Sequence, residues 1–424
     1  MLQLTQIQNN KSAVINGLGK RNFAEAEKII NRVIELDKQR KALQSELDTI
    51  LNEINIKSRS IGNLLKNGKH EEAEQAKQDT KNLKEKSRKY SEALSDTQIQ
   101  LDDLLYAIPN IPHDDVPLGN TSEDNLVVYQ WGEKPELPED ALPHWDLIEK
   151  YDIIDFKLGN KITGAGFPVY KGKAAKLQRA LINFFLDEAE KAGYQEIQPP
   201  VLINDDSGRA TGQLPDKEGQ MYRLSDDDYY LIPTAEVPIT NIYRNTILNI
   251  EDLPVKNVGY TPCFRREAGS WGSHVRGLNR LHQFDKVEIV QIQKPADSYK
   301  TLDEMCDYVK KLLVKLELPF RMVRLCGGDL GFTSAMTYDM EVYSAVQDKW
   351  LEVSSISNCE TYQANRLKLR FKDKDNKNIL LHTLNGSALA LPRVVAALLE
   401  NNQTSEGILI PGVLRGYTGF DIIR

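Results

Sequence analysis

The residues best suited to chemistry lie in one strand–loop–strand segment, residues 264–288. Arg265 and Glu267 follow its first strand, a glycine-bearing loop comes next, and Arg280 and Phe284 lie where the chain returns. Arginine suits phosphate oxygens because its planar fork donates two parallel hydrogen bonds. Phe284 can stack on a base, and Glu267 can accept a hydrogen bond from an exocyclic amine. The segment therefore predicts a nucleotide site, whereas the plain structural alternative is an Arg265–Glu267 ion pair above a core Phe284.

Two further segments carry related chemistry. In Glu352-Val353-Ser354-Ser355 a carboxylate and a hydroxyl stand three residues apart, and such oxygen ligands suit Mg²⁺ together with substrate phosphates. The segment from Asn385 to Arg393 lies between an expected strand and an expected helix, with Pro392 in the first helical turn. A cation there opposes the helix dipole, which suggests an anionic partner for Arg393. The sequence has neither a P-loop nor a G-x-G-x-x-G pattern that opens a helix, so side chains on a sheet must hold any nucleotide.

From about residue 126 onward, short strands alternate irregularly with helices. Consecutive strands without intervening helices favour an antiparallel sheet, and hence an α+β fold rather than a doubly wound parallel one. We expect strands over Val127–Trp131, Glu196–Gln198, Tyr229–Ile232, Val258–Phe264, Phe284–Gln291, Phe320–Leu325, Asp339–Ala345, Trp350–Ser355 and Ile379–Leu384. We expect helices over Lys173–Ala192, Ala296–Leu316 and Pro392–Asn401.

The first quarter of the chain has a different pattern. Between about residues 21 and 106 there is no proline, and apolar residues recur on two seven-residue tracks. The tracks are Ile29, Leu36, Leu43, Ile50 and Val33, Leu47, Ile54, Ile61, the second interrupted by Arg40. Such a seam predicts a long supercoiled helix. The pattern stops at a turn signal, residues 66–69, and a second helix with a weaker seam follows, so we expect an antiparallel hairpin roughly 60 Å long.

Basic residues follow the second helix of this hairpin, among them Lys77, Lys81, Lys84 and Arg88. The plain interpretation is a solvated helix face balanced by acidic neighbours such as Glu74. The alternative is a strip that meets the phosphates of a nucleic acid.

Composition limits the classes of protein to consider. The 424 residues, 41 % of them apolar, suit two or three domains with a sizeable core. The 54 basic and 61 acidic residues give a net charge of −7, so nucleic-acid binding requires a local patch. No stretch approaches the roughly 18 apolar residues of a membrane span. The first residues lack the order of a secretion signal. Four dispersed cysteines favour a reducing compartment, so we expect a cytoplasmic protein.

Several motifs in this order resemble a known family. The segment 265–288 resembles motif 2 of class II aminoacyl-tRNA synthetases, and its strings Glu267-Ala268-Gly269-Ser270 and His282-Gln283-Phe284 are similar to those of bacterial seryl-tRNA synthetases. Thr234-Ala235-Glu236 resembles their Thr-x-Glu loop, and Arg393 matches the motif 3 arginine. The chain departs from the family at Arg266, Ala388 and Pro392, where serine or glycine is common.

The resemblance implies an arrangement of domains and subunits. Residues 1–108 would form an N-terminal tRNA-binding domain with an antiparallel coiled-coil arm, residues 109–125 a linker, and residues 126–424 a class II catalytic domain with an antiparallel sheet. A homodimer would pair through the helix Lys173–Ala192, whose apolar side carries Leu177, Leu181, Phe184 and Phe185.

The implied activity is that of a serine–tRNA ligase. With ATP and Mg²⁺ it would convert L-serine to seryl-adenylate and pyrophosphate, and then transfer the seryl group to the 3′-end of serine tRNA. Selenocysteine tRNA would be a further substrate only where the host has one. Two rival classes are an adenylating enzyme that charges a carrier protein, which would be expected to lack the arm, and a non-catalytic scaffold, which would be expected to lack the motif arginines.

By the same resemblance, Arg265 and Arg393 are the catalytic residues. ATP would be bound by Arg265, Arg266, Glu267, Arg280, Phe284, Glu352, Val353, Ser354, Ser355 and Arg393. Serine would be bound by Thr234, Ala235, Glu236, Arg265, Glu288 and Ser387. Glu352 and Ser355 would hold Mg²⁺, and tRNA would meet Lys77, Lys81, Lys84 and Arg88.

Overall fold

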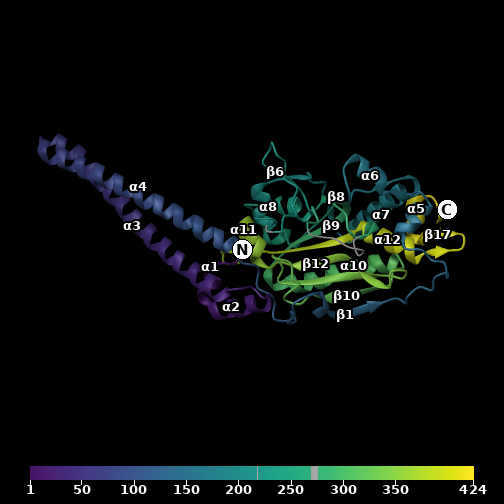
Figure 1. Cartoon of the computed structure of the whole chain (residues 1–424). Helices are drawn as coiled ribbons and strands as arrows, with labels where there is room; N and C mark the ends of the chain where they lie inside the picture. The colour runs from purple at the N-terminus through teal and green to yellow at the C-terminus, as the bar shows by residue number, and fades with distance from the viewer. Residues whose placement is uncertain (217, 269–275) are drawn as a thin grey trace. The chain divides into compact units, whose positions relative to one another are not determined.

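The computed structural model describes residues 1–216, 218–268 and 276–424 (Figure 1). The chain separates into two compact units. One comprises Leu2–Gly19 and Phe23–Pro109, and the other comprises Asn110–Arg424 together with Met1 and Lys20–Asn22. Among the described residues, no helix combines the length and the apolarity that crossing a bilayer requires.

Two long helices dominate the first unit. Helices α3 (Ala26–Lys66) and α4 (His70–Ala107) pack along each other, as Figure 1 shows, and α1 (Leu4–Asn9) and α2 (Lys11–Lys20) precede them. The 41 residues of α3 extend about 60 Å at the helical rise of about 1.5 Å per residue. The predicted helical hairpin, including the position of its turn, is confirmed.

The seam between α3 and α4 follows the predicted heptads. Its buried apolar side chains include Val33, Leu36, Ile50, Leu101 and Leu105. Where the seam of α4 is weaker, it buries Thr80 and Thr97, whose hydroxyls donate to the backbone oxygens of Ala76 and Ala93 at 2.7 and 2.8 Å. Because both hydroxyls have partners, threonine at these positions adds no unpaired buried polar group.

Arg40 interrupts a heptad track because its side chain pairs with a buried carboxylate, that of Asp37. The carboxylate of Asp37 is buried, and Arg40 and Lys41 pair with it at 2.8 and 2.6 Å. Burial raises the pKa of Asp37, but hydrogen bonds from Lys41, Arg40 and Gln8 outweigh burial and hold that pKa below its ordinary value. The bond from Gln8 also ties α1 to α3.

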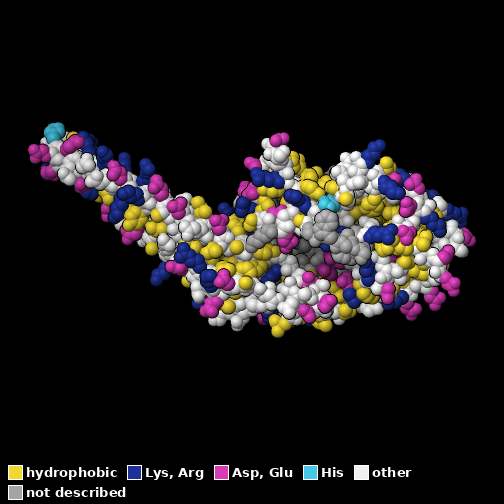
Figure 2. Space-filling model, viewed as in Figure 1, with side chains coloured by type: hydrophobic (Ala, Val, Ile, Leu, Met, Phe, Trp, Pro, Cys, Tyr) yellow, Lys and Arg dark blue, Asp and Glu magenta, His cyan; other side chains and the backbone are white. Residues whose placement is uncertain are grey.

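The predicted basic strip lies on the exposed face of α4. Lys77 pairs with Glu74, and Arg88 pairs with Glu92, both at 2.9 Å, while Lys81 and Lys84 are exposed. Exposed pairs of this kind contribute little stability, so the cations can exchange partners at low cost. Figure 2 shows basic and acidic side chains interspersed along the helical pair. A role of this strip in binding tRNA stays a prediction.

An eight-stranded sheet organises the second unit. Its strand order is β1-β10-β11-β12-β15-β9-β8-β4, and neighbours pair antiparallel except for the short parallel pair β4–β8. The strands are β1 (Leu126–Trp131), β4 (Gln195–Glu196), β8 (Val255–Phe264), β9 (Gln283–Gln293), β10 (Phe320–Arg324), β11 (Met336–Ser344), β12 (Lys349–Asn358) and β15 (His382–Ala390). The predicted α+β fold with an antiparallel sheet is confirmed.

Smaller sheets surround this one. They consist of β2 (Ile154–Asp155) with β3 (Val169–Tyr170), β5 (Leu202–Asn204) with β6 (Tyr229–Leu231), β13 (Arg370–Lys372) with β7 (Ile247–Leu248) and β14 (Asn378–Leu380), and β17 (Gly407–Leu409) with β16 (Gln403–Thr404) and β18 (Ile422–Ile423).

Three helices of the second unit pack against the large sheet: α7 (Gly172–Lys191), α10 (Ser298–Lys315) and α12 (Leu391–Asn401). Each lies within two residues of its predicted bounds. The sequence did not predict the short helices α5 (His144–Lys150), α6 (Phe156–Ile162), α8 (Asp205–Thr211), α9 (Glu236–Asn241), α11 (Thr361–Leu367) and α13 (Arg415–Thr418). Elements of seven residues or fewer are too short to display a helical period.

The four apolar side chains of α7 that were predicted to face a second subunit face the core instead. Leu177, Leu181, Phe184 and Phe185 are at most 1 % exposed and belong to the core of their own subunit. The amphipathic pattern of α7 therefore reports packing against the sheet. Pairing of two subunits through this helix stays a prediction.

The central strand β15 also differs from the prediction, which ended a strand at Leu384. The strand continues through Gly386 to Ala390. A Cβ atom at Gly386 would lie 3.0 Å from Cγ1 of Ile356 on the adjacent strand β12. Glycine here permits a close approach between two strands, so it does not mark the end of one.

Candidate active site

Arg265 lies at the end of β8, over a ring on the neighbouring strand. Its guanidinium carbon is 5.2 Å from the ring centroid of Phe284, which is a cation–π contact, and its Nε donates to the backbone oxygen of Pro233 at 3.4 Å. Glu267 instead accepts a hydrogen bond from Nε of Arg280. The ion pair of this segment is thus Arg280–Glu267, and the plain alternative of an Arg265–Glu267 pair is wrong.

The backbone around Glu267 is unusual. Glu267 has φ of 49°, a left-handed conformation that non-glycine residues rarely adopt. The adjacent Arg266 has an exposed side chain, and its backbone N–H donates to the backbone oxygen of Gln220 at 2.9 Å. Glu267, which is predicted to bind ATP, therefore has the kind of backbone conformation that functional sites often contain.

Arg393, in the first turn of α12, has the anionic partner that its position in the helix predicts. Its Nη1 lies 3.5 Å from a carboxylate oxygen of Glu352 and donates to the backbone oxygen of the same residue at 2.8 Å. Its Nε donates to the backbone oxygen of Asn279 at 3.1 Å. Two backbone oxygens and one carboxylate therefore fix the direction in which this guanidinium points.

Glu352 and Ser355 lie on β12, where the sequence predicted Mg²⁺. Asp339 on β11 faces Ser355 in register, and one of its carboxylate oxygens is buried without a hydrogen-bond partner. Burial, and then the charge of Glu352, hold the pKa of Asp339 well above its ordinary value. A nearby cation would relieve both effects, so the residues present fit a divalent ion. The described ranges contain no group of three or more His, Cys, Asp or Glu side chains that could hold a metal ion, so Mg²⁺ would need phosphate and water ligands as well.

A cluster of buried charged and polar side chains lies on β9 and the segments next to it. Nζ of Lys286 is 2.7 Å from Oε2 of Glu288, and it donates to Oγ1 of Thr234 at 2.9 Å. The two charged side chains are 7 % and 3 % exposed. Ser387 on β15 donates to the same carboxylate oxygen at 3.5 Å. The cluster thus brings together three residues predicted to bind serine: Thr234, Glu288 and Ser387. Lys286, which was not predicted, contacts the first two of them.

Glu236 opens α9 on the same side of the sheet. Its carboxylate accepts a hydrogen bond from Nε2 of Gln363 at 2.7 Å, and Thr383 donates to Oε1 of that glutamine at 2.7 Å. Burial, and then the charge of Glu288, raise the pKa of Glu236 to about 7. A second charged carboxylate is therefore unfavourable here until a cation approaches.

Three predicted residues can contribute only through their backbone. The side chain of Val353 belongs to the core, Ala235 packs with Ile239 and Val290, and the hydroxyl of Ser354 donates to the backbone oxygen of Ser387 at 2.5 Å. Their predicted roles in binding stay untested.

Sequence reasoning missed Lys286, Asp339 and Gln363. Lys286 stands two residues before Glu288 on one strand, so alternation along β9 was a signal that could have placed it on the same face. Nothing in the local sequence marks Gln363, whose partners come from distant segments.

Comparisons with known proteins first define the class. Residues 221–402 match the model of the class II tRNA synthetase core domain for glycine, histidine, proline, serine and threonine. Residues 1–112 match the seryl-tRNA synthetase N-terminal domain.

Individual relatives narrow the class to one family. The chain is 46 % identical to a serine–tRNA ligase of Salinibacter ruber, over 99 % of this chain and 98 % of that protein, and 42 % identical to one of Clostridium tetani over the full length of both. A crystal structure of seryl-tRNA synthetase from Pyrococcus horikoshii complexed with ATP is 33 % identical, with a TM-score of 0.91 over 100 % of this chain and 99 % of that one. The chain belongs to the seryl-tRNA synthetase family.

Glu236→Gln should reveal the cost of ionising this buried carboxyl. A pKa raised from 4.5 to about 7 favours folding below the lower value, and this stability is lost as pH rises through the upper one. Relative to Glu236→Gln, the unfolding free energy of the wild type should therefore fall by up to about 3 kcal/mol between these pH values, and stay level below them. Urea unfolding across this pH range measures the difference.

Glu251→Gln, at an exposed glutamate, is the matched control and should run parallel to the wild type. A constant difference between Glu236→Gln and the wild type at every pH would contradict the raised pKa.

Proposed function

We propose that this chain activates L-serine with ATP and transfers the seryl group to serine tRNA, with the residue roles given below. The observation that carries these roles is the buried Lys286–Glu288 ion pair, which lies on the strand next to β8, where Arg265 follows. Family membership supports the overall reaction, and the similar Pyrococcus horikoshii protein was crystallised with ATP.

In the first step a serine carboxylate oxygen attacks the α-phosphorus of ATP. A new P–O bond forms, the bond to the β-phosphate bridge breaks, and pyrophosphate leaves. Arg265 holds the α-phosphate, while Arg280 and Arg393 hold the outer phosphates. Such a reaction requires positioning and charge neutralisation more than covalent help from the protein.

The adenine would lie against Phe284, with Arg393 on its other face and Glu267 accepting from its amine. Glu267 pairs with Arg280, and Glu352 contacts Arg393. ATP binding would therefore exchange these internal contacts for phosphate and adenine contacts. Glu352 and Ser355 would hold Mg²⁺, whose charge offsets that of the phosphates when it is bound.

Serine would be chosen by a hydrogen bond from its hydroxyl to Glu288. Lys286 pairs with this carboxylate at 2.7 Å and holds it in place for that bond, while Thr234, Glu236 and Ser387 would line the rest of the serine site. Alanine would leave buried polar groups unpaired, which gives strong rejection. Threonine keeps the hydroxyl and must be excluded by its additional methyl group.

In the second step the seryl group moves from the adenylate to the 3′-OH of the terminal ribose, and AMP leaves. The hairpin α3–α4 would bind a part of the tRNA far from that end, in this family the long variable arm. Charging of selenocysteine tRNA and a cytoplasmic location stay predictions.

A homodimer is part of this proposal, but one of the two arguments for it, the apolar side of α7, no longer applies. The apolar side chains of α7 are buried within the subunit, so the dimer rests on family resemblance alone. Sedimentation at micromolar concentration tests it, and a fully active monomer would contradict it.

Serine-dependent ATP–pyrophosphate exchange tests the proposed reaction. The wild type should exchange with serine in the absence of tRNA. Arg265→Ala should reduce exchange by a factor on the order of 100 or more, because it removes a phosphate contact and no core packing. The control Arg223→Ala removes an arginine that pairs with Asp228 at 2.8 Å on the surface, and it should retain wild-type exchange.

Exchange without charging of tRNA by the wild type would favour the carrier-protein alternative, and no exchange at all would favour the scaffold. Near-normal exchange by a folded Arg265→Ala protein would overturn the role of Arg265.

Removing the arm should separate the two steps. With Asn31 to Asp102 replaced by a short glycine bridge, serine-dependent exchange should persist, while charging of serine tRNA should fall by orders of magnitude. Alanine at Lys77, Lys81, Lys84 and Arg88 should cause a smaller loss. It should also flatten the salt dependence of tRNA binding between about 50 and 200 mM, because fewer counterions are released.

Alanine at Lys28, Arg32 and Lys38, which are exposed on α3 outside this strip, is the matched control and should leave the salt dependence almost unchanged. If the armless protein charged tRNA as well as the intact one, the arm would not bind tRNA.

A further inference from the structure

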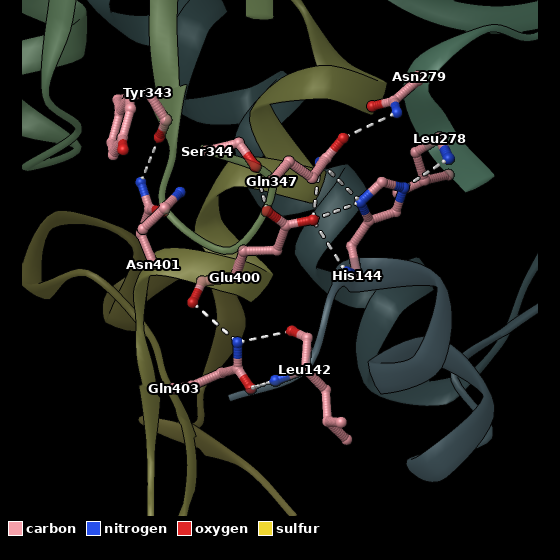
Figure 3. A network of polar contacts seen from close by, with 11 residues as sticks. Leu142, His144, Leu278, Asn279, Tyr343, Ser344, Gln347, Glu400, Asn401 and Gln403 are labelled. Atoms are coloured by element: carbon pink, nitrogen blue, oxygen red, sulfur yellow. Dashed lines mark hydrogen bonds and ion pairs between the residues drawn. The ribbon is translucent and has the colours of Figure 1, made fainter. Parts of the chain in front are cut away.

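A buried polar network joins four separate segments of the second unit (Figure 3). It connects α5, the turn Gly277–Asn279, the loop after β11 and the helix α12. Its two central side chains, His144 and Glu400, are both 0 % exposed. The roles proposed above make no use of either side chain.

Both nitrogens of the His144 ring are engaged. Nδ1 lies 2.7 Å from Oε1 of Glu400, and Nε2 accepts the backbone N–H of Leu278 at 2.9 Å. A nitrogen that accepts a backbone N–H carries no proton, so the hydrogen resides on Nδ1 and is donated to the carboxylate. The histidine thus acts as a directed link from Glu400 to the turn.

Glu400 is saturated with donors. It accepts from the backbone N–H of His144 at 2.9 Å, from Nε2 of Gln347 at 2.8 Å and from the hydroxyl of Ser344. Burial raises the pKa of Glu400, but hydrogen bonds from the His144 ring, the Ser344 hydroxyl and the His144 backbone N–H outweigh burial and hold that pKa below its ordinary value. Apolar residues of similar volume would fill such a space at lower cost, whereas this polar arrangement fixes directions.

The second branch of the network reaches the same turn. Oε1 of Gln347 accepts from the side-chain amide of Asn279 at 3.1 Å. Gly277 has φ of +68°, and a Cβ there would lie 2.3 Å from Nε2 of His144, so the turn sits directly against the imidazole. Just before it, Arg276 stacks over Trp145 of α5 at 5.0 Å.

The turn Gly277–Asn279 is directly connected to two arginines of the proposed ATP site, to one by a hydrogen bond and to the other through the chain. The backbone oxygen of Asn279 accepts from Nε of Arg393 at 3.1 Å, and Arg280 is the next residue along the chain. A displaced turn would therefore withdraw one of the two backbone acceptors of Arg393 and shift the start of the segment that carries Arg280.

We infer that His144 and Glu400 are positioning residues for ATP: they hold the turn Gly277–Asn279 and, through it, orient Arg393 and Arg280 toward the phosphates. This inference rests on the proposed ATP site. It predicts a selective effect on ATP, because among the described residues no hydrogen bond joins Lys286 or Glu288 to the network.

The test measures KM for ATP and KM for serine separately in the exchange reaction. His144→Ala should raise KM for ATP tenfold or more and leave KM for serine within twofold. Glu400→Gln can retain the hydrogen bonds if the Ser344 hydroxyl turns to accept, so its KM for ATP should stay close to that of the wild type, whereas Glu400→Leu should behave like His144→Ala.

If His144→Ala folds poorly, two further variants can still test the inference. Gly277→Ala moves the turn against an intact histidine and should raise KM for ATP alone. His382→Ala removes another buried histidine, whose Nδ1 lies 2.8 Å from the hydroxyl of Ser298, and it should leave both KM values unchanged.

An unchanged KM for ATP in folded His144→Ala and Gly277→Ala proteins would overturn the inference. So would an equal rise in both KM values, or a fall in the active fraction with both KM values unchanged, because those results describe a purely structural role. A wild type without serine-dependent exchange would instead overturn the proposed function.

Discussion

The proposed chemistry depends on the buried ion pair between Lys286 and Glu288 inside the sheet. A buried carboxylate is costly without a partner, and Lys286 supplies one at 2.7 Å from the next position on the same face of β9. The charge of Glu288 also acts on the neighbouring Glu236: burial and this charge together raise the pKa of Glu236. Because residues from α9, β9 and β15 complete the proposed serine site, it exists only when the antiparallel sheet has formed.

The three arginines proposed to bind ATP contact other side chains of the same chain, and ATP phosphates can replace these contacts. Arg280 pairs with Glu267, Arg393 contacts Glu352, and Arg265 lies over Phe284. These contacts hold the guanidinium groups near their proposed working positions, which lowers the ordering cost of binding. The network of His144 and Glu400 adds to this preorganisation, because it holds the turn whose backbone oxygen binds Arg393.

The sequence predicted best what depends on local pattern. Heptads predicted the hairpin α3–α4, the strand pattern of residues 284–291 predicted β9, and the helix dipole predicted an anionic partner for Arg393. It failed where long-range packing decides: Gly386 continues a strand because Ile356 approaches closely, and the apolar residues of α7 face their own core. The His144–Glu400 contact spans 256 residues, so no local pattern could reveal it. The motif resemblance, rather than periodicity, supplied the residue roles.

The most direct test of the account is the discrimination between serine and alanine by Glu288→Ala in pyrophosphate exchange. The account predicts that KM for serine rises by a factor on the order of 100 or more, that KM for ATP stays within about threefold, and that the preference for serine over alanine falls sharply. An unchanged KM for serine together with a collapse of ATP affinity would assign Glu288 to the nucleotide site and contradict the account.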